Sequence, residues 1–141
     1  LDIEIDKPRD TVVALFDDTA NMKAYLEGIQ SYELISGNYR EVGSKYKMKV
    51  KMGDREIEML ETITKRDLPH ETAFTYEADG VFNSVNHKFV AISENKTKLI
   101  AESEFQFQGF MKIIAFLMPG EFKKQTDIYL VDFKKFVEKQ N

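Results

Sequence analysis

Glu61 and His87 are the side chains of this sequence best placed for acid–base chemistry, because both share a predicted strand face with apolar residues. Glu61 lies in phase with Ile57, Met59 and Ile63, so the alternation places it on their face. Carboxylates are rarely buried without a partner, since desolvation of the charge is costly or forces protonation. Glu61 therefore anchors or acts on a ligand, or it makes a structural contact to a tyrosine hydroxyl. A bulge near Met59 that turns it outward is the third alternative.

His87 forms a second inward polar group with Asn83 and Ser103. Its alternatives are a structural hydrogen bond and ligand or acid–base chemistry. The sequence carries no nucleophile elbow for a serine triad that would use Ser103. His70, the other histidine, follows Pro69 in a predicted surface loop and has no spacing suited to zinc. We therefore expect no metal site, and we expect no cofactor.

The composition limits the classes of protein to which the chain can belong. Its 141 residues suffice for one core and are too few for two ordinary domains, so we predict a single domain over 1–141. The net charge of -4 gives no basic footprint for nucleic acid. The absence of cysteine excludes disulfides, thiolate metal sites and a cysteine nucleophile. Neither glycine-rich phosphate-binding motif occurs.

No apolar run approaches the roughly 20 residues that span a bilayer, and no signal-peptide pattern opens the chain. We therefore expect no integral membrane segment and a cytoplasmic location. The chain starts at Leu1 rather than at Met, which leaves open whether residues precede it. The sequence also leaves the oligomeric state open.

The elements that must position these side chains follow a regular order. Alternating apolar and acidic residues predict a first strand. Two short helices come next: the first begins at Pro8, and the second is capped by Asp18 or Thr19 and stops at Gly28. From 29 to 107 the period is mainly two, which predicts six more strands in hairpins. Turn signals separate them at Gly37-Asn38, Gly53-Asp54, Leu68-Pro69, Asp79-Gly80 and Glu94-Asn95.

The hairpin at Gly53-Asp54 predicts its own register. A two-residue turn places Met48 opposite Met59 on one face, with Tyr46 opposite Glu61. The same turn pairs Lys49 with a glutamate on the other face, so we interpret the lysine ladder as a solvated surface. The outward residues are Lys45, Lys47, Lys49 and Lys51, and the inward ones Tyr46, Met48 and Val50.

The later hairpins extend the same face. A six-residue loop around Leu68-Pro69 places Tyr76 beside Glu61, and the turn at Asp79-Gly80 places Tyr76 opposite Asn83. A three-residue loop over 94–96 gives the following pairs: Ala91 with Leu99, Phe89 with Ala101 and His87 with Ser103.

The final segment, 109–141, changes from alternation to helical spacing. Pro119 lacks the amide donor, so we expect it to separate a short helix or gate over about 110–118 from a long helix that starts near 121. The apolar stripe of this segment must cover one face of the sheet. It comprises Phe110, Ile113, Ile114, Leu117, Phe122, Tyr129, Phe133, Phe136 and Val137.

This order of elements resembles the START-like or SRPBCC superfamily, within which the chain looks most like the small bacterial polyketide cyclase/dehydrase and lipid-transport group. Tyr25 stands where such proteins often carry tryptophan. The resemblance implies an α+β helix-grip fold, in which a curved seven-stranded antiparallel sheet wraps around a long C-terminal helix. It rests on IEIDKPRDTVVALFDDTANMKAYLEGIQSYELISG, REVGSKYKMKV, ITKRDLPHETAFTY, and NKTKLIAESEFQF with the helix that follows.

The resemblance also implies a hydrophobic cavity between the sheet and the terminal helix. We therefore predict binding or transport of a small hydrophobic ligand such as a lipid, a polyketide or an isoprenoid. One alternative is a polyketide aromatase or cyclase that uses Glu61 or His87, and another is a protein-interaction module like the chaperone activators. The predicted lining residues are Tyr46, Met48, Met59, Glu61, Phe74, Tyr76, Asn83, His87, Phe89, Ser103, Phe105, Phe107, Leu117 and Tyr129.

Overall fold

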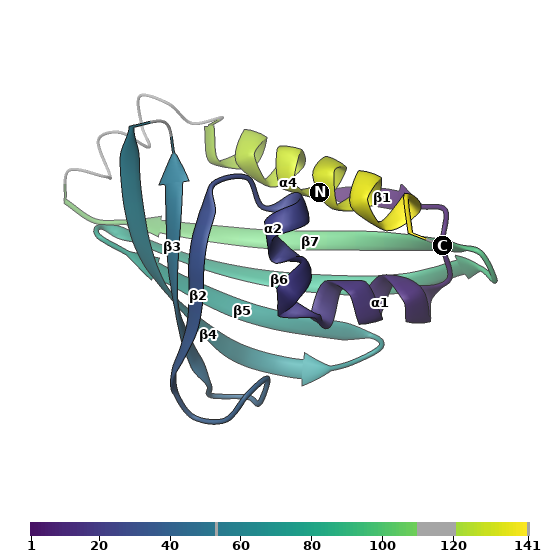
Figure 1. Cartoon of the computed structure of the whole chain (residues 1–141), viewed down its shortest axis with the longest axis horizontal. Helices are drawn as coiled ribbons and strands as arrows, with labels where there is room; N and C mark the ends of the chain where they lie inside the picture. Colours follow the sequence, from purple (N-terminus) through teal and green to yellow (C-terminus); the bar gives the residue numbers. More distant parts are fainter. Residues whose placement is uncertain (53, 110–120, 141) are drawn as a thin grey trace.

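A curved antiparallel sheet wraps around one long helix in the computed structural model, which describes residues 1–52, 54–109 and 121–140 (Figure 1). The elements are β1 Asp2–Ile5, α1 Arg9–Asp17, a 3-10 turn Thr19–Asn21, α2 Met22–Tyr25, β2 Ile29–Ser36, β3 Lys45–Met52, β4 Arg55–Asp67, β5 Glu71–Ala78, β6 Val81–Ser93, β7 Lys96–Phe107 and α4 Glu121–Glu138. The predicted α+β helix-grip class is confirmed.

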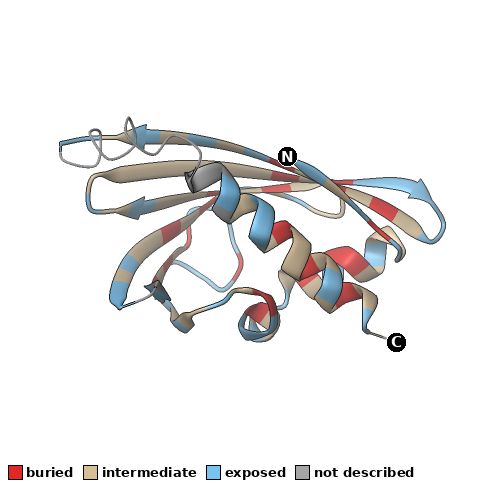
Figure 2. Cartoon of the chain, turned by 90° about the horizontal axis from the view of Figure 1, so that it is seen from above, coloured by how far each residue is buried: buried red, intermediate tan, exposed pale blue. Residues whose placement is uncertain are grey.

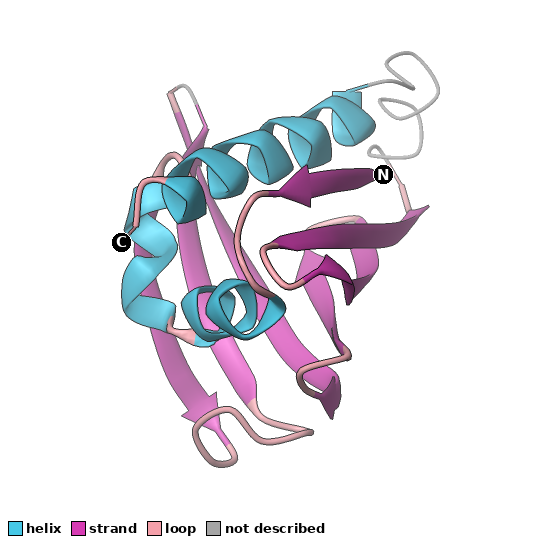
Figure 3. Cartoon of the chain, turned by 90° about the vertical axis from the view of Figure 1, so that its right-hand side faces the viewer, coloured by secondary structure: helices cyan, strands magenta, loops and turns pink. Residues whose placement is uncertain are grey.

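The seven strands lie in the order β1-β7-β6-β5-β4-β3-β2, and each pair is antiparallel. The helices gather on one face of this sheet, which we call the inner face (Figure 3). α4 lies against β1 and α2, while α1 lies on β6 and β7. None of the described helices is long and apolar enough to cross a membrane.

The register of β3 and β4 follows from the turn between them, as predicted. Met48 pairs with Met59, Tyr46 pairs with Glu61, and Lys49 pairs with Glu58. Tyr46 and Met48 are buried, whereas the ladder lysines are partly or fully exposed. Alternation around a short turn is therefore enough to orient this hairpin.

The predicted register of β6 and β7 is wrong by two residues. His87 pairs with Ala101 rather than with Ser103, and Phe89 pairs with Leu99. A bulge between Ala91 and Ser93 accompanies a tighter turn at residues 94–95. A shift of two residues keeps every side chain on its predicted face, because the strand period is two.

The helices begin and end close to the predicted residues. α1 starts directly after Pro8. Asp18 caps the next turn, since its Oδ1 accepts a hydrogen bond of 3.0 Å from the amide of Ala20. Gly28 has a φ of 84°, and a Cβ atom there would lie 2.2 Å from the Lys51 carbonyl oxygen. Only glycine allows the chain to pass so close to β3.

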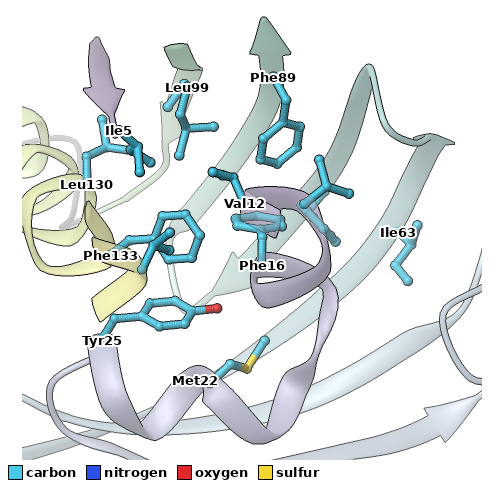
Figure 4. Packing of buried hydrophobic residues seen from close by; sticks show 14 of the residues in the cluster. Ile5, Val12, Phe16, Met22, Tyr25, Ile63, Phe89, Leu99, Leu130 and Phe133 are labelled. Atoms are coloured by element: carbon cyan, nitrogen blue, oxygen red, sulfur yellow. The ribbon is translucent and has the colours of Figure 1, made fainter. Parts of the chain in front are cut away.

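The hydrophobic core sits where α1, α2 and the second half of α4 face the sheet, and buried positions on these elements face one another (Figure 2). Phe16 of α1 is its centre, with its ring 5.3 Å from that of Phe89 and 5.6 Å from that of Phe133 (Figure 4). The ring of Tyr25 lies 4.9 Å from Phe133. These aromatic side chains close one end of the sheet against water.

The predicted break at Pro119 and the gate over 110–118 lie outside the described residues, as does Leu117. The described part of the long helix, α4, runs from Glu121 to Glu138. Polar contacts hold its second half to the first strand. The Nζ atom of Lys134 donates to the Glu4 carbonyl at 2.6 Å, and the Asp6 amide donates to a Glu138 carboxylate oxygen at 2.8 Å.

Candidate functional site

The strand registers arrange the inner face in rows that cross the sheet. One row runs through Tyr46, Glu61, Tyr76, Asn83 and Phe105. A second row, next to it, contains Met48, Met59, Ala78, Val81 and Phe107. Together these rows bring most of the predicted lining residues to one end of the sheet, away from the aromatic core.

The two ends of the inner face differ in how fully they are covered. Phe89 and Leu99 are sealed beneath the helices. Tyr76, Phe105 and Phe107 at the other end keep accessible surface although they face the same side. We call this second group, with Met59 and Asn83, the open end. The rings of Phe105 and Phe107 stack there at 5.9 Å with an interplanar angle of 8°.

Glu61 is buried in the row that borders the open end, with 1% of its surface exposed. The hydroxyl of Tyr32 donates a short hydrogen bond to Oε1 of Glu61, and Tyr76 is a further hydrogen-bond partner. Burial raises the pKa of Glu61, while the tyrosine hydrogen bonds and the positive charge of Arg40 oppose that rise. The carboxyl group is thus fully partnered and still holds its proton more tightly than in water.

Arg40 is the second buried charge of the site, and no pattern in the sequence predicted it. Its Nη1 atom donates to the hydroxyl of Tyr32 at 3.1 Å, and its amide donates to the hydroxyl of Tyr46 at 2.7 Å. The guanidinium carbon lies 5.8 Å from the ring centre of Phe74. Its backbone has a φ of 58°, a left-handed conformation that few non-glycine residues adopt.

Asp17 connects this arginine to a second one. The Nε and Nη2 atoms of Arg40 donate to Oδ1 of Asp17 at 3.3 Å and 3.2 Å. Arg66 donates to both carboxylate oxygens, each at 2.7 Å. Its hydrogen bonds are the main reason why the pKa of Asp17 falls below 3.8, and the nearby Arg40 adds to that effect against the cost of burial. We call Asp17, Arg66, Arg40, Tyr32 and Glu61 the polar chain.

The rings of Tyr32 and Tyr46 hold the middle of the polar chain in place. They are stacked at 4.6 Å with an interplanar angle of 9°. Burial and the adjacent Glu61 raise the pKa of Tyr32, so its hydroxyl stays protonated and donates to Glu61. The predicted tyrosine partner of Glu61 is therefore found in Tyr32 and Tyr76, while the Tyr46 hydroxyl serves Arg40 instead.

His87 lies apart from the polar chain, in the row that contains Thr72 and Ala101. Thr72 is four residues from Tyr76 along β5, which is about 13 Å at roughly 3.3 Å per residue. The His87 ring lies 4.9 Å from Phe16, 6.0 Å from Phe74 and 6.1 Å from Tyr129. Burial lowers the pKa of His87 to about 4, so the ring is neutral at pH 7.

Several predicted site residues have other roles in the structure. Ser103 lies opposite Val85 and not opposite His87, so the proposed serine–histidine pair does not form. The side chain of Asn83 donates to the Glu104 carbonyl at 3.0 Å. Tyr46, Met48, Glu61, Phe74, His87 and Phe89 are buried. The described lining residues that keep accessible surface are Met59, Tyr76, Asn83, Ser103, Phe105, Phe107 and Tyr129. No group of three or more His, Cys, Asp or Glu side chains in the described part of the chain is placed to hold a metal ion.

A depression of about 470 Å³ lies against β5, β6 and β7, away from the polar chain. Its lining includes Ser84, Asn86, Glu102 and Glu104 of the outer face, together with Phe74, Val85, Ala101 and Ser103, which alternate with them along the strands. No residue of the polar chain lines it. We therefore place the candidate site on the inner face.

The sequence matches the family described as polyketide cyclase / dehydrase and lipid transport over residues 1–128. No curated protein matches it. Many solved structures share its fold. A conserved protein from Geobacillus kaustophilus has a TM-score of 0.81 at 18% identity, covering 98% of this chain and 93% of its own.

Two enzymes are among these structural neighbours. The Zhui aromatase/cyclase from Streptomyces sp. R1128 has a TM-score of 0.82 at 10% identity and covers 98% of this chain and 91% of its own. Norcoclaurine synthase from Thalictrum flavum, in complex with dopamine and hydroxybenzaldehyde, has a TM-score of 0.69 at 17% identity and covers 100% of this chain and 86% of its own. At such identities the likeness concerns the fold alone.

Proposed function

The chain belongs to the polyketide cyclase/dehydrase and lipid transport family, and from that premise we propose that it binds and carries a small hydrophobic ligand between the inner face of the sheet and α4. The ligand would lie over the open end and reach toward Glu61. The family description and the shared fold support this class of function.

The observation that carries the proposal is the environment of Tyr76 and Tyr129. Both side chains keep accessible surface, yet burial raises the pKa of each well above 10.0. Tyr76 faces inward in the row of Glu61, and the ring of Tyr129 on α4 lies 6.1 Å from that of His87. We propose that the accessible surface of these two side chains lines an interior hollow between the sheet and α4. Such a hollow suits an apolar ligand.

A second function, catalysis of a cyclase type, is favoured by one specific feature. Glu61 is a buried carboxyl group whose pKa is raised, which is the property of a general acid or base. The same feature serves a carrier equally well, because a protonated carboxyl group can donate a hydrogen bond to a ligand. Carrier function needs fewer assumptions, so we place it first. A protein-interaction module would leave the interior filled, which the accessible surface of the open end does not favour.

A pair of tryptophan substitutions tests the location of the ligand. Ser103→Trp enlarges an inward residue beside the proposed hollow, and Glu104→Trp adds the same ring on the outer face. We expect Ser103→Trp to lower the affinity for 1-anilinonaphthalene-8-sulfonate about tenfold, or 1.4 kcal/mol, and Glu104→Trp to leave it unchanged. The native chain has no tryptophan, so the emission of each variant also reports its own surroundings.

Equal probe affinity in both variants would contradict the proposed location. Urea unfolding of the two proteins serves as the control, since an overpacked core is destabilised by about 1–3 kcal/mol. Mass spectrometry of molecules that co-purify from the host through native gel filtration then identifies natural ligands. Chemical conversion of such a ligand by the pure protein, abolished in Glu61→Gln, would favour the enzyme over the carrier.

A further inference from the structure

His87 carries a buried polar atom with no hydrogen-bond partner. Its Nδ1 atom makes no hydrogen bond to any residue that the structure describes, although only 4% of the side chain is exposed. The hydroxyl of the facing Thr72 donates to the Lys65 carbonyl at 3.0 Å and does not serve the ring. Buried polar atoms of native proteins nearly always have a partner, so an exception calls for an explanation.

The position of His87 on the sheet indicates what that partner is. On one side along β6, the pair Phe89 and Leu99 is sealed in the core. On the other side lies the pair Val85 and Ser103, which also borders the outer-face depression, and beyond it the inward pair Asn83 and Phe105 keeps accessible surface. His87 therefore stands at the boundary between the filled end of the inner face and the proposed hollow. Its surroundings are otherwise apolar rings, from Phe16, Phe74 and Tyr129.

The charge state of the His87 imidazole limits which chemical groups can form a hydrogen bond with its Nδ1 atom. The imidazole is neutral at pH 7 because burial disfavours its charged form. A neutral ring offers one N–H donor and one acceptor nitrogen, and either can occupy Nδ1. A carboxylate or phosphate would need a donor and a counter-charge there, whereas a hydroxyl group satisfies both tautomers. An alkyl chain would leave the nitrogen unpartnered.

We propose that the ligand carries a hydroxyl group on its apolar framework, and that this hydroxyl forms a hydrogen bond with Nδ1 of His87. This inference rests on the proposed function and deepens it, because it names the class of ligand: a phenol or an alcohol rather than a hydrocarbon or a fatty-acid chain end. His87 acts as a binding residue that selects the hydroxyl. Glu61 lies in a different row and serves another part of the ligand.

Two matched probes test the inference: 2-naphthol and 2-methylnaphthalene, which differ in a hydroxyl and a methyl group of similar size. We expect the preference of the wild type for 2-naphthol, expressed as the ratio of the two dissociation constants, to fall about tenfold in His87→Phe. That fall corresponds to about 1.4 kcal/mol. The greater hydrophobicity of the methyl compound affects the ratio equally in both proteins, so it cancels when the ratio of the wild type is compared with that of His87→Phe. An unchanged ratio in His87→Phe, with both probes still bound, would overturn the inference and leave the carrier function standing.

Failure of the carrier function looks different, because neither probe would then bind the wild type. That result would overturn the inference with it. A measurement on the wild type removes any dependence on how well His87→Phe folds. The sequence has two histidines, so ¹⁵N-histidine labelling gives resolvable signals, with His70 as the control in its exposed loop. We expect 2-naphthol to shift the Nδ1 resonance of His87 and not the signals of His70. An Nδ1 resonance that is unaffected by saturating 2-naphthol would mean that another group, such as a buried water, is the partner.

Discussion

Glu61 combines two properties that rarely occur together at a purely structural position. Its carboxyl group is almost wholly buried, and it is held by tyrosine hydroxyls rather than by a direct ion pair. The positive charge of Arg40 reaches it through the Tyr32 hydroxyl, which accepts from Arg40 and donates to Glu61. A hydroxyl in this place stabilises the carboxylate without neutralising it. The carboxyl group therefore remains able to exchange a proton or to bond a ligand.

The substitution Glu61→Gln should change stability in a pH-dependent way. Burial raises the pKa of Glu61 above 4.5, so the folded state binds the proton more tightly than the unfolded chain. The stability that Glu61 contributes is fully present below about pH 4.5 and is lost as the pH rises through the folded pKa. Glutamine does not titrate. We therefore expect wild type and variant to differ by about 1 kcal/mol or less at pH 4, and the variant to gain relative stability up to pH 8.

Urea unfolding across this range, with Glu58→Gln as the control, measures the effect. Glu58 lies on the same strand, but its side chain is 58% exposed and its partner is the exposed Lys47, so its substitution should give no comparable trend. A constant difference between wild type and Glu61→Gln at every pH would contradict the raised pKa. Probe affinity separates the roles of Glu61: a structural residue leaves it within a few-fold, and an anchor loses about tenfold.

The residues of the polar chain divide into those the sequence predicts and those it does not. Glu61, together with its neighbour Tyr76 outside the polar chain, follows from strand alternation and turn positions. Tyr32 lies on a strand with register shifts at both ends, between Ile29 and Ser31 and between Leu34 and Ser36, which hide its phase. Arg40 belongs to a loop whose left-handed backbone turns the side chain inward. No periodic pattern in the sequence predicts such a turn, so the role of Arg40 becomes visible only in the structure.

At the scale of elements, the end of α1 is where the helix and the sheet are joined by charge. Asp17 closes α1, and an acidic residue at a helix C-terminus is unfavourable toward the helix dipole. Arg66 from β4 and Arg40 from the loop before β3 offset that cost with several hydrogen bonds to one carboxylate. Asp17 therefore fixes the position of α1 relative to the strands that carry Glu61.

The substitution Asp17→Asn should destabilise the protein by about 1–2 kcal/mol at pH 7, with allowance for the partial exposure of this site. The arginine hydrogen bonds lower the pKa of Asp17 below 3.8. The stability that they provide is present above that pH and is lost as the pH falls through the folded pKa. We therefore expect the difference between wild type and Asp17→Asn to shrink from pH 7 toward pH 2, as measured by urea unfolding.

Glu102→Gln is the matched control for this ion pair. Glu102 forms an exposed pair with Lys88, at 2.9 Å, and its loss should change the free energy of unfolding by less than about 0.5 kcal/mol. If Asp17→Asn were equally mild, the junction would be an ordinary surface contact. If its effect persisted unchanged at low pH, the cause would be packing rather than charge.

The order of the strands, and the side of the sheet on which each side chain lies, could be predicted from the sequence because hairpins are local. Each short turn fixes the register of its own pair, as for Met48 opposite Met59. Bulges escape such reasoning, since an extra residue leaves the apolar alternation on both sides intact. The bulge between Ile63 and Lys65 shortens the predicted loop and still brings Tyr76 to Glu61. The bulge near Ser93 moves His87 from Ser103 to Ala101, so the predicted register pair of His87 and Ser103 does not form.

At the scale of the whole molecule, stability and proposed ligand binding depend on different ends of the inner face. The second half of α4 is fixed by the buried Leu130, Phe133 and Val137 and by polar contacts to β1. The aromatic side chains of the open end keep accessible surface. A hollow lined by apolar rings lowers stability relative to a filled core. The proposed hollow would therefore depend on the stability that the sealed end supplies.

Two phenylalanine truncations should show this division directly. Phe133→Ala removes a ring with 0% exposure from the centre of the sealed end, so we expect a loss of about 3–5 kcal/mol in the free energy of unfolding. The milder Phe133→Leu keeps the protein folded if that loss is too large.

Phe105→Ala removes a partly exposed ring of the open end and should cost only about 1 kcal/mol, while it weakens binding of 1-anilinonaphthalene-8-sulfonate about three- to tenfold. Phe133→Leu should leave probe affinity within about twofold, because its ring faces Phe16 and Tyr25 and not the hollow. Urea unfolding and fluorescence titration of the three variants measure both quantities. If Phe105→Ala were the more destabilising change, or Phe133→Leu the more damaging to binding, the inner face would be one continuous core with no division between its ends.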